Sequence, residues 1–297
     1  MLAFSRRFST SSLCSRHLTV IGAGQMGVGI AYVAAANAKI DVTLVDNSAA
    51  SLDRGNKFVE KLLSKNVAKG KITQEDADGI RSRMKSSSNL EQVVASTDFV
   101  IEAVPEIVSL KEKIFAQLAQ VANKDAILGT NTSSISITRI AAAAVGAEDR
   151  VVGVHFMNPV PVQKGVEMIR GLQTSDSAWA SAIELVGSMG KVISKSEDTP
   201  GFLANRILMP YINEAIICLE TGIGKPADID SILKNGCAMP MGPLALADFI
   251  GLDTCLAIMN VLYKDTGDSK YRPSVLLQRM VDAKWFGVKS GKGFYEY

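Results

Sequence analysis

The 297-residue sequence predicts an α/β fold: a doubly wound, mostly parallel sheet with a projecting helical arm, followed by a smaller all-α domain. Between residues 17 and 198, short β-rich runs alternate with helical runs, as expected for parallel strands joined by crossover helices. From Phe202 onward, apolar residues recur with the helical period, and no strand run is convincing. The polar stretch Ser196–Gly201, which contains Pro and Gly, therefore marks a junction between domains at 17–198 and 199–297.

The strands of the first domain are predicted from short apolar runs between polar or glycine-containing segments. Helical patterns such as 26–37 and 110–121 lie between most of them. In chain order the predicted strands are His17–Gly22, Val42–Val45, Phe99–Ala103, Ala126–Gly129, Val151–His155, Glu167–Arg170 and Val192–Ser194.

The composition excludes several classes of protein. Hydrophobic residues make up 47% of the chain and charged residues 21%, which is the balance of a globular protein and not of a disordered one. Thirty-two Lys and Arg against 30 Asp and Glu give a net charge of +2, so the electrostatic basis for binding nucleic acid is missing. The four Cys form no CxxC pair and no cluster with His, so no metal site is predicted.

An uncharged stretch at Leu18–Ala38 is long enough to span a membrane. Its four glycines, however, divide it into a strand, a turn and a helix of small residues. We therefore predict no integral membrane segment.

Residues 1–16 have the composition of a mitochondrial transit peptide. They contain three Arg, five Ser and no acidic residue, and the first acid of the chain is Asp41. We expect this segment to direct the protein to the mitochondrial matrix, although a basic tail without a targeting role is the alternative.

A glycine motif directly follows the first predicted strand. In Gly22-x-Gly24-x-x-Gly27 the glycines permit a tight turn, a close approach of the backbone to a pyrophosphate, and close helix packing. Gln25 and Met26 lie inside the motif and are expected to contact the cofactor. Asp46 ends the second strand, where a carboxylate binds the ribose 2′-hydroxyl and repels a 2′-phosphate. The sequence therefore predicts a Rossmann-type domain that binds NAD and not NADP, with FAD as a minor alternative.

One histidine is a candidate catalytic residue. Apart from His17, which borders the predicted transit peptide, His155 is the only histidine of the chain, and it ends an apolar strand. Glu167 follows twelve residues later. A single histidine on a strand is more often structural, so these residues alone leave its role open.

Seven segments between residue 18 and residue 297 are distinctive as a set. They are VIGAGQMGVGIA, IEAVPE, NTSSISIT, HFMNPVPV, DTPGFLANRIL, MGPLALADFIGLD and KSGKGFYEY. In these segments and in their order the sequence resembles the L-3-hydroxyacyl-CoA dehydrogenase family, and the set as a whole is highly specific.

The resemblance implies NAD-dependent oxidation of the 3-hydroxyl of an acyl-CoA, as in fatty acid β-oxidation. It implies that His155 is the general base, that Glu167 orients it, and that Ser133 contacts both the reacting oxygen and the cofactor. Asn205 matches an amide near the thioester of the substrate. The further cofactor contacts that it implies are Glu106, Lys111, Asn158 and Lys289, and the expected assembly is a homodimer.

Four lysines, Lys57, Lys61, Lys65 and Lys69, recur at every fourth position and so share one helical face. For a generic protein this pattern indicates a solvated stripe on a projecting helical hairpin. Because a helical arm at this position contacts CoA in the family, the resemblance implies that Lys69 and Lys65 bind the substrate.

Two other functions remain open. One is a crystallin-like NAD-dependent dehydrogenase of a free hydroxy acid, and the other is a NAD-binding structural or sensor protein with a relic site. Gly165 departs from the bulkier apolar residue expected at its position, which leaves the preference for acyl-chain length in doubt. No hydratase-like sequence is attached, so we expect a monofunctional enzyme.

Overall fold

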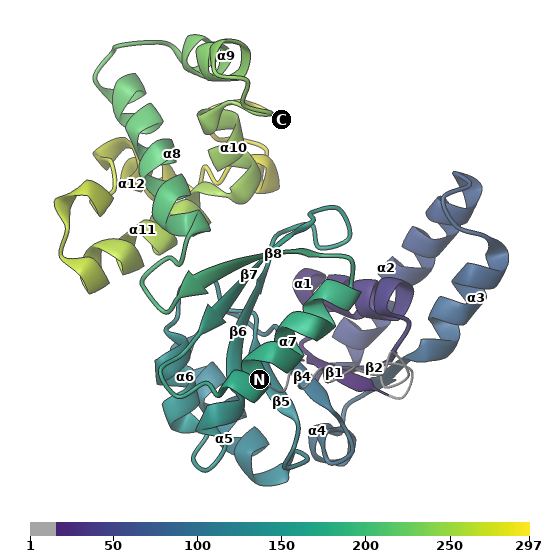
Figure 1. Cartoon of the computed structure of the whole chain (residues 1–297). Coiled ribbons are helices and arrows are strands. Elements are labelled where there is room, and N and C mark those ends of the chain that lie inside the picture. The colour runs from purple at the N-terminus through teal and green to yellow at the C-terminus, as the bar shows by residue number, and fades with distance from the viewer. Residues whose placement is uncertain (1–15) are drawn as a thin grey trace, which may run out of the picture. The chain divides into compact units, whose positions relative to one another are not determined.

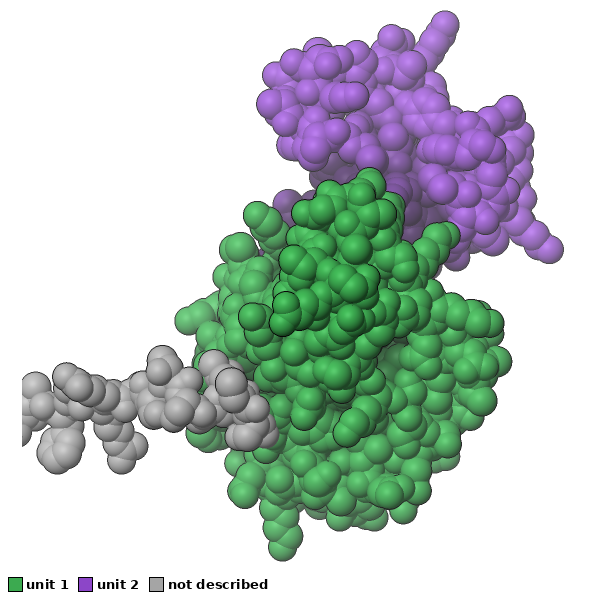
Figure 2. All heavy atoms as spheres, turned by 90° about the vertical axis from the view of Figure 1, so that its right-hand side faces the viewer, with its two compact units in different colours: residues 1–198 green, residues 199–297 purple. Residues whose placement is uncertain are grey.

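A computed structural model describes residues 16–297. The predicted transit peptide thus lies outside the described residues, except for Arg16 at its end. The chain divides between Asp198 and Thr199 into two compact units, which Figure 2 colours green and purple. Each unit has its own hydrophobic core.

The first unit is built on one eight-stranded sheet. Its strands are β1 (His17–Ile21), β2 (Asp41–Val45), β3 (Met84–Ser87), β4 (Phe99–Glu102), β5 (Ile127–Thr130), β6 (Val151–Phe156), β7 (Gly165–Arg170) and β8 (Val192–Glu197). Their order across the sheet is β3-β2-β1-β4-β5-β6-β7-β8 (Figure 1). Neighbouring strands of this sheet run parallel except β6 and β7, which are antiparallel. The prediction of a mostly parallel sheet is therefore confirmed.

The strand β3 is missing from the sequence prediction. Its residues, Met-Lys-Ser-Ser, contain no apolar run, and none of the four is fully buried. It is the edge strand beside β2, where polar side chains face solvent and leave no hydrophobic pattern to detect.

Helices cover both faces of the sheet (Figure 1). Val152, Val154 and Phe156 of β6 belong to a core that also contains buried residues of α1 and α7. The intervening Gly153 faces Ile137 of α6 on the other side, where a Cβ would lie 2.7 Å from the Ile137 side chain. The helices of this unit are α1 (Gln25–Val33) with its π-helical extension η2 (Ala34–Ala38), α2 (Ala49–Ala68), α3 (Gln74–Arg83), α4 (Leu90–Val94), α5 (Val108–Val121), α6 (Ile137–Ala143), the 3₁₀ turn η3 (Glu148–Arg150) and α7 (Asp176–Ser188).

The predicted helical arm is formed by α2 and α3, which extend beyond the sheet in Figure 1. At its base, Gly55 of α2 lies so close to α1 that a Cβ there would be 2.8 Å from the Val28 side chain. Thr73 and Asp76 form a capping box at the start of α3. The arm is thus a helical hairpin that packs against α1 of the first unit.

The carboxyl ends of β1, β4, β5 and β6 lie at one edge of the sheet because these strands are parallel. Between β1 and β4 the strand order reverses, which is where open α/β sheets bind ligands. The loops that follow these strands therefore collect the candidate site residues at this edge.

The second unit is helical. Its core contains apolar residues of each of its five α-helices, among them Met209, Leu244, Met259 and Leu277. Its helices are α8 (Ala204–Glu220), α9 (Pro226–Gly236), α10 (Pro243–Ile250), α11 (Leu252–Thr266) and α12 (Val275–Asp282), with the 3₁₀ turns η4 (Ser269–Tyr271) and η5 (Val288–Ser290).

Within residues 16–297, no single helix is long and apolar enough to cross a membrane. The pair α10 and α11 meets the length and composition criteria together, but it bends by 95° at its break.

The segment 287–297 folds back onto α10 through Asp248, which is 1% exposed. Its carboxylate accepts bonds from the backbone N–H groups of Phe294 and Tyr295, both at 3.0 Å, and from the Tyr297 hydroxyl at 3.1 Å. A Cβ at Gly293 would overlap this carboxylate. The glycine and aromatic residues of KSGKGFYEY therefore fit the surroundings of one buried acid.

Candidate active site

The glycine turn between β1 and α1 has the geometry that its sequence predicts. Gly22 has φ +103°, a conformation that L side chains rarely adopt, and a Cβ there would lie 2.8 Å from the carbonyl oxygen of Ala103. A Cβ at Gly27 would overlap the carbonyl oxygen of Gly22. Both positions thus require glycine for the backbone to close this turn.

A pocket of about 820 Å³ opens beside the turn and is lined by Gly22, Gly24, Gln25, Met26 and Asp46, among others. A Cβ at Gly24 would meet nothing within 4 Å, so this glycine leaves open space and not a packing contact. The N-terminus of α1 adds backbone N–H groups and a partial positive charge that suit phosphates. These residues fit the pyrophosphate and ribose of NAD.

Asp46 is held in place by two backbone amides. Its Oδ2 accepts from Ala23 N and its Oδ1 from Ser48 N, both at 2.8 Å. Each carboxylate oxygen can accept more than one bond, so the side chain keeps acceptor capacity for ribose hydroxyls. The fixed negative charge in the pocket wall disfavours a 2′-phosphate.

His155 and Glu167 are direct partners in the antiparallel pairing of β6 with β7. Directly opposed residues on such strands point to the same face with their Cβ atoms about 5 Å apart. His155 Nδ1 lies 2.8 Å from Glu167 Oε2, and the two side chains are 11% and 5% exposed. The carboxylate fixes the orientation of the ring and favours a proton on Nδ1.

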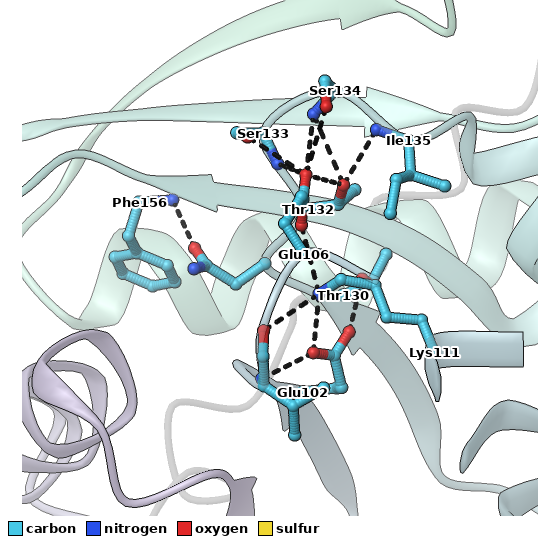
Figure 3. Close-up of polar contacts among 11 residues, drawn as sticks. Glu102, Glu106, Lys111, Thr130, Thr132, Ser133, Ser134, Ile135 and Phe156 are labelled. Atoms are coloured by element: carbon cyan, nitrogen blue, oxygen red, sulfur yellow. Dashed lines mark hydrogen bonds and ion pairs between the residues drawn. The ribbon is translucent and has the colours of Figure 1, made fainter. Parts of the chain in front are cut away.

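The loop after β5 is organised by one carboxylate oxygen (Figure 3). Glu106 Oε1 accepts from the hydroxyls of Thr132 at 2.6 Å, Ser133 at 3.0 Å and Ser134 at 3.3 Å. It also accepts from the backbone N–H groups of Ser133 at 2.7 Å and Ser134 at 3.1 Å. We call residues 132–134 the serine loop. Ser133 is half-buried and Ser134 is buried, so Ser133 is the more accessible of the two serines.

Partial burial would by itself raise the pKa of Glu106, and this is the largest effect on it. The charge of Lys111 and the hydrogen bonds from Thr132 and Ser133 outweigh burial, so the pKa lies below its ordinary value. Glu106 is therefore a fixed anion at neutral pH.

Lys111 lies behind Glu106, and its contact with the cofactor stays a prediction. Its side chain is fully buried, and its Nζ lies 2.7 Å from Glu102 Oε1 and 3.4 Å from Glu106 Oε2. The helical pattern of 110–121 indicated no ion-pair partner for this lysine, whereas in the structure it pairs with two glutamates.

The other predicted residues fall in different places. Asn158 is exposed in the loop after β6, and Lys65 and Lys69 are exposed at the end of α2. Asn205 is a buried residue at the start of α8, and Lys289 pairs with Asp253, both within the second unit. Gly165 is exposed at the start of β7, where a Cβ would meet nothing within 4 Å, so its lack of a side chain opens no space in a core.

Three residues of this region were missed by the sequence interpretation. Glu102 ends an apolar strand as a fully buried acid, and Thr132 bonds to Glu106. Asp198 accepts bonds from the Ser136 hydroxyl and from the N–H groups of Ile137 and Thr138, at 2.8 to 2.9 Å. An acid that ends an apolar run is the one signal that could have identified Glu102. Among residues 16–297, no group of three or more His, Cys, Asp or Glu side chains could hold a metal ion.

The class of protein that this sheet and pocket define is the NAD-dependent dehydrogenases. Residues 17–199 match the family described as 3-hydroxyacyl-CoA dehydrogenase, NAD binding domain, and residues 201–297 match the family described as 3-hydroxyacyl-CoA dehydrogenase, C-terminal domain. The chain therefore belongs to the 3-hydroxyacyl-CoA dehydrogenase family.

Individual relatives agree with this assignment. A Bradyrhizobium diazoefficiens protein named 3-hydroxybutyryl-CoA dehydrogenase is 49% identical over 94% of this chain and 94% of its own. A human protein named hydroxyacyl-coenzyme A dehydrogenase, mitochondrial, is 40% identical over 99% of this chain and 98% of its own. The crystal structure of (S)-3-hydroxybutyryl-CoA dehydrogenase from Ralstonia eutropha has a TM-score of 0.91 at 45% identity and covers 95% of this chain and 99% of that chain.

Substitutions at Gly24 and at Gly27 should distinguish an effect on NAD binding alone from an effect on folding. Gly27→Ala introduces an overlap with the Gly22 backbone, so we expect a loss of about 1–3 kcal/mol of stability together with NAD affinity. Gly24→Ala fills only pocket space, so we expect an unchanged Tm and a Kd for NAD raised at least about tenfold. Thermal melts and calorimetric NAD titrations measure both. A Gly24→Ala variant with wild-type NAD affinity would contradict pyrophosphate binding at this turn.

Proposed function

We propose that this chain interconverts L-3-hydroxyacyl-CoA and 3-ketoacyl-CoA with NAD as the cofactor. The observation that carries the proposal is the 2.8 Å bond between His155 and Glu167 on the sheet edge that also holds the glycine turn. Membership in the 3-hydroxyacyl-CoA dehydrogenase family supports the substrate class. The Bradyrhizobium and Ralstonia relatives, both named for 3-hydroxybutyryl-CoA, favour short acyl chains.

His155 acts as the general base. Because Nδ1 bonds to Glu167, the proton of the substrate hydroxyl is taken at Nε2, and the imidazolium returns it in the reverse direction. The Glu167 carboxylate stabilises the positive charge that the ring gains. When bound, NAD supplies the hydride acceptor.

Ser133 donates a hydrogen bond to the reacting oxygen of the substrate. In the structure its hydroxyl donates to Glu106 at 3.0 Å, while its backbone N–H holds the residue on the same carboxylate at 2.7 Å. A rotation about the Cα–Cβ bond redirects the hydroxyl without moving the backbone. For Asn205 we keep the role that the family resemblance implies, a contact with the substrate near its thioester.

The arm provides the cations for CoA. Lys65 and Lys69 lie at the end of α2 remote from the sheet, and neither forms an ion pair among the described contacts. Ammonium groups bind phosphates as mobile point charges, which suits the phosphates of CoA.

We also propose import into the mitochondrial matrix and a homodimer. The basic, acid-free segment 1–16 supports import, and the human relative is named as mitochondrial. Exposed apolar side chains on the second unit, including Ile207, Ile223, Ile232 and Val275, support association with a second copy. β-Oxidation of fatty acids is the pathway that such an activity serves.

The activity is tested by steady-state assays with matched substrates and cofactors. We expect reduction of acetoacetyl-CoA with NADH, and kcat/KM at least about tenfold lower with NADPH because Asp46 repels the 2′-phosphate. Free acetoacetate lacks the CoA contacts and should be a poor substrate. Equal activity on free acids would favour the crystallin-like alternative, and NAD binding without turnover would favour a relic site.

Replacement of the base provides a second test. We expect His155→Gln to lower kcat by about 10²–10⁴-fold, since a positioned base contributes that much, while NAD affinity stays nearly unchanged. His17→Gln is the matched control, because His17 starts β1 at the opposite end of the strand from the glycine turn and bonds to Thr43. Unchanged turnover in His155→Gln would remove this residue from the mechanism.

The lysine stripe offers a comparison within one helix. We expect the double variant Lys65→Ala/Lys69→Ala to raise the KM for acetoacetyl-CoA about 3- to 10-fold, as for two exposed charge contacts, and to weaken its salt dependence. Lys57→Ala/Lys61→Ala removes the same charge from the same stripe nearer the sheet and should change KM less. If the two double variants raised KM equally, the lysines would act through the overall positive charge of the stripe and not through a binding site at the end of the arm.

A further inference from the structure

We propose that Glu102 is a positioning residue for Ser133: it neutralises the buried Lys111 and so leaves Glu106 free to hold the serine loop. The inference deepens the proposed function, because it rests on the role of Ser133 at the reacting oxygen.

Glu102 is anchored from three directions at the end of β4. Its Oε1 accepts from Lys111 Nζ and from Val104 N, both at 2.7 Å, and its Oε2 accepts from the Thr130 hydroxyl at 2.7 Å. The side chain is completely buried. A carboxylate so held can neither move nor exchange partners with solvent.

Lys111 lies between two carboxylates but is closer to one of them. Its Nζ is 2.7 Å from Glu102 and 3.4 Å from Glu106 Oε2. Coulomb attraction rises as distance falls, and a buried ammonium needs a partner at close range. Glu102 is therefore the nearer partner of the ammonium group, and Glu106 Oε2 is the second one.

Glu102, Lys111 and Glu106 together carry one net negative charge, and Glu106 is the carboxylate farther from the lysine. Its Oε1, the oxygen not directed at Lys111, accepts the five bonds from Thr132, Ser133 and Ser134. Figure 3 shows the sequence of contacts from Glu102 through Lys111 and Glu106 to the serine loop.

Glu102→Gln removes the charge while keeping the shape of the side chain. Glu106 then becomes the remaining carboxylate within reach of Lys111, and the buried ammonium pulls it away from the serine loop. Ser133 then loses the bond that holds its backbone N–H, so its hydroxyl reaches the reacting oxygen from a displaced position.

The test is a double-mutant cycle between Glu102→Gln and Ser133→Ala, read as kcat for acetoacetyl-CoA reduction with NADH in the full chain. We expect Glu102→Gln to lower kcat about 10- to 100-fold when Ser133 is present, as for a misplaced catalytic group, and less than about twofold in the Ser133→Ala background. Thr19→Val is the control, because Thr19 of β1 donates a buried hydroxyl bond to Thr97 just before β4, and its loss should leave kcat unchanged.

The outcomes are distinguishable. If Glu102→Gln lowers kcat by the same factor in both backgrounds, Glu102 is merely structural and the inference is overturned, while an impaired Ser133→Ala leaves the proposed function intact. If Ser133→Ala is as active as the wild type, the role of Ser133 and the inference that rests on it fall, while the activity itself stands. If the wild type does not reduce acetoacetyl-CoA, the proposed function falls.

Should circular dichroism show that Glu102→Gln does not fold, Thr130→Val takes its place. This variant removes only the hydroxyl donor to Glu102 Oε2. We expect a smaller loss of kcat that also disappears in the Ser133→Ala background, and persistence of the loss there would overturn the inference.

Discussion

The antiparallel pairing of β6 with β7 is the constraint on which the candidate site depends. Parallel neighbours need a long crossover, whereas antiparallel strands can be joined by a short loop. In this sheet the change of direction allows residues 155 and 167 to become direct partners across two adjacent strands. The pair is then set at the sheet edge by backbone hydrogen bonds, so its geometry does not depend on a flexible loop.

Three carboxylates near the glycine turn are also held in place by backbone N–H groups. Asp46, Glu102 and Glu106 each accept backbone N–H groups, and a buried lysine joins the last two. Backbone donors fix a carboxylate more firmly than side-chain partners do, because they carry no rotamer freedom of their own. The site is therefore pre-organised by main-chain amides that the fold already holds in place.

The sequence allowed a feature to be predicted where a short motif both has a clear chemical role and lies at the end of a predicted strand. The glycine turn and Asp46 each follow from a strand end and a short motif, and the mostly parallel sheet follows from the alternation of elements. The pairing of His155 with Glu167 was implied only by the family resemblance, because a single histidine at a strand end is by itself ambiguous. The polar edge strand β3 has no hydrophobic period and could not be found this way. The burial of Lys111 could not be foreseen either, since a lysine in a helical pattern is normally solvated, and only tertiary packing brings two acids to it.

The hydrogen bonds from residues 294–297 to the buried Asp248 carboxylate affect the order in which the two units can fold during translation. The sheet is complete once β8 has emerged from the ribosome, whereas Asp248 receives its donors only when residues 294–297 have been translated. Until then the nascent helical unit holds a carboxylate that burial would leave unsolvated. The first unit can therefore fold during translation, whereas the second unit can complete its fold only after residues 294–297 have been synthesised.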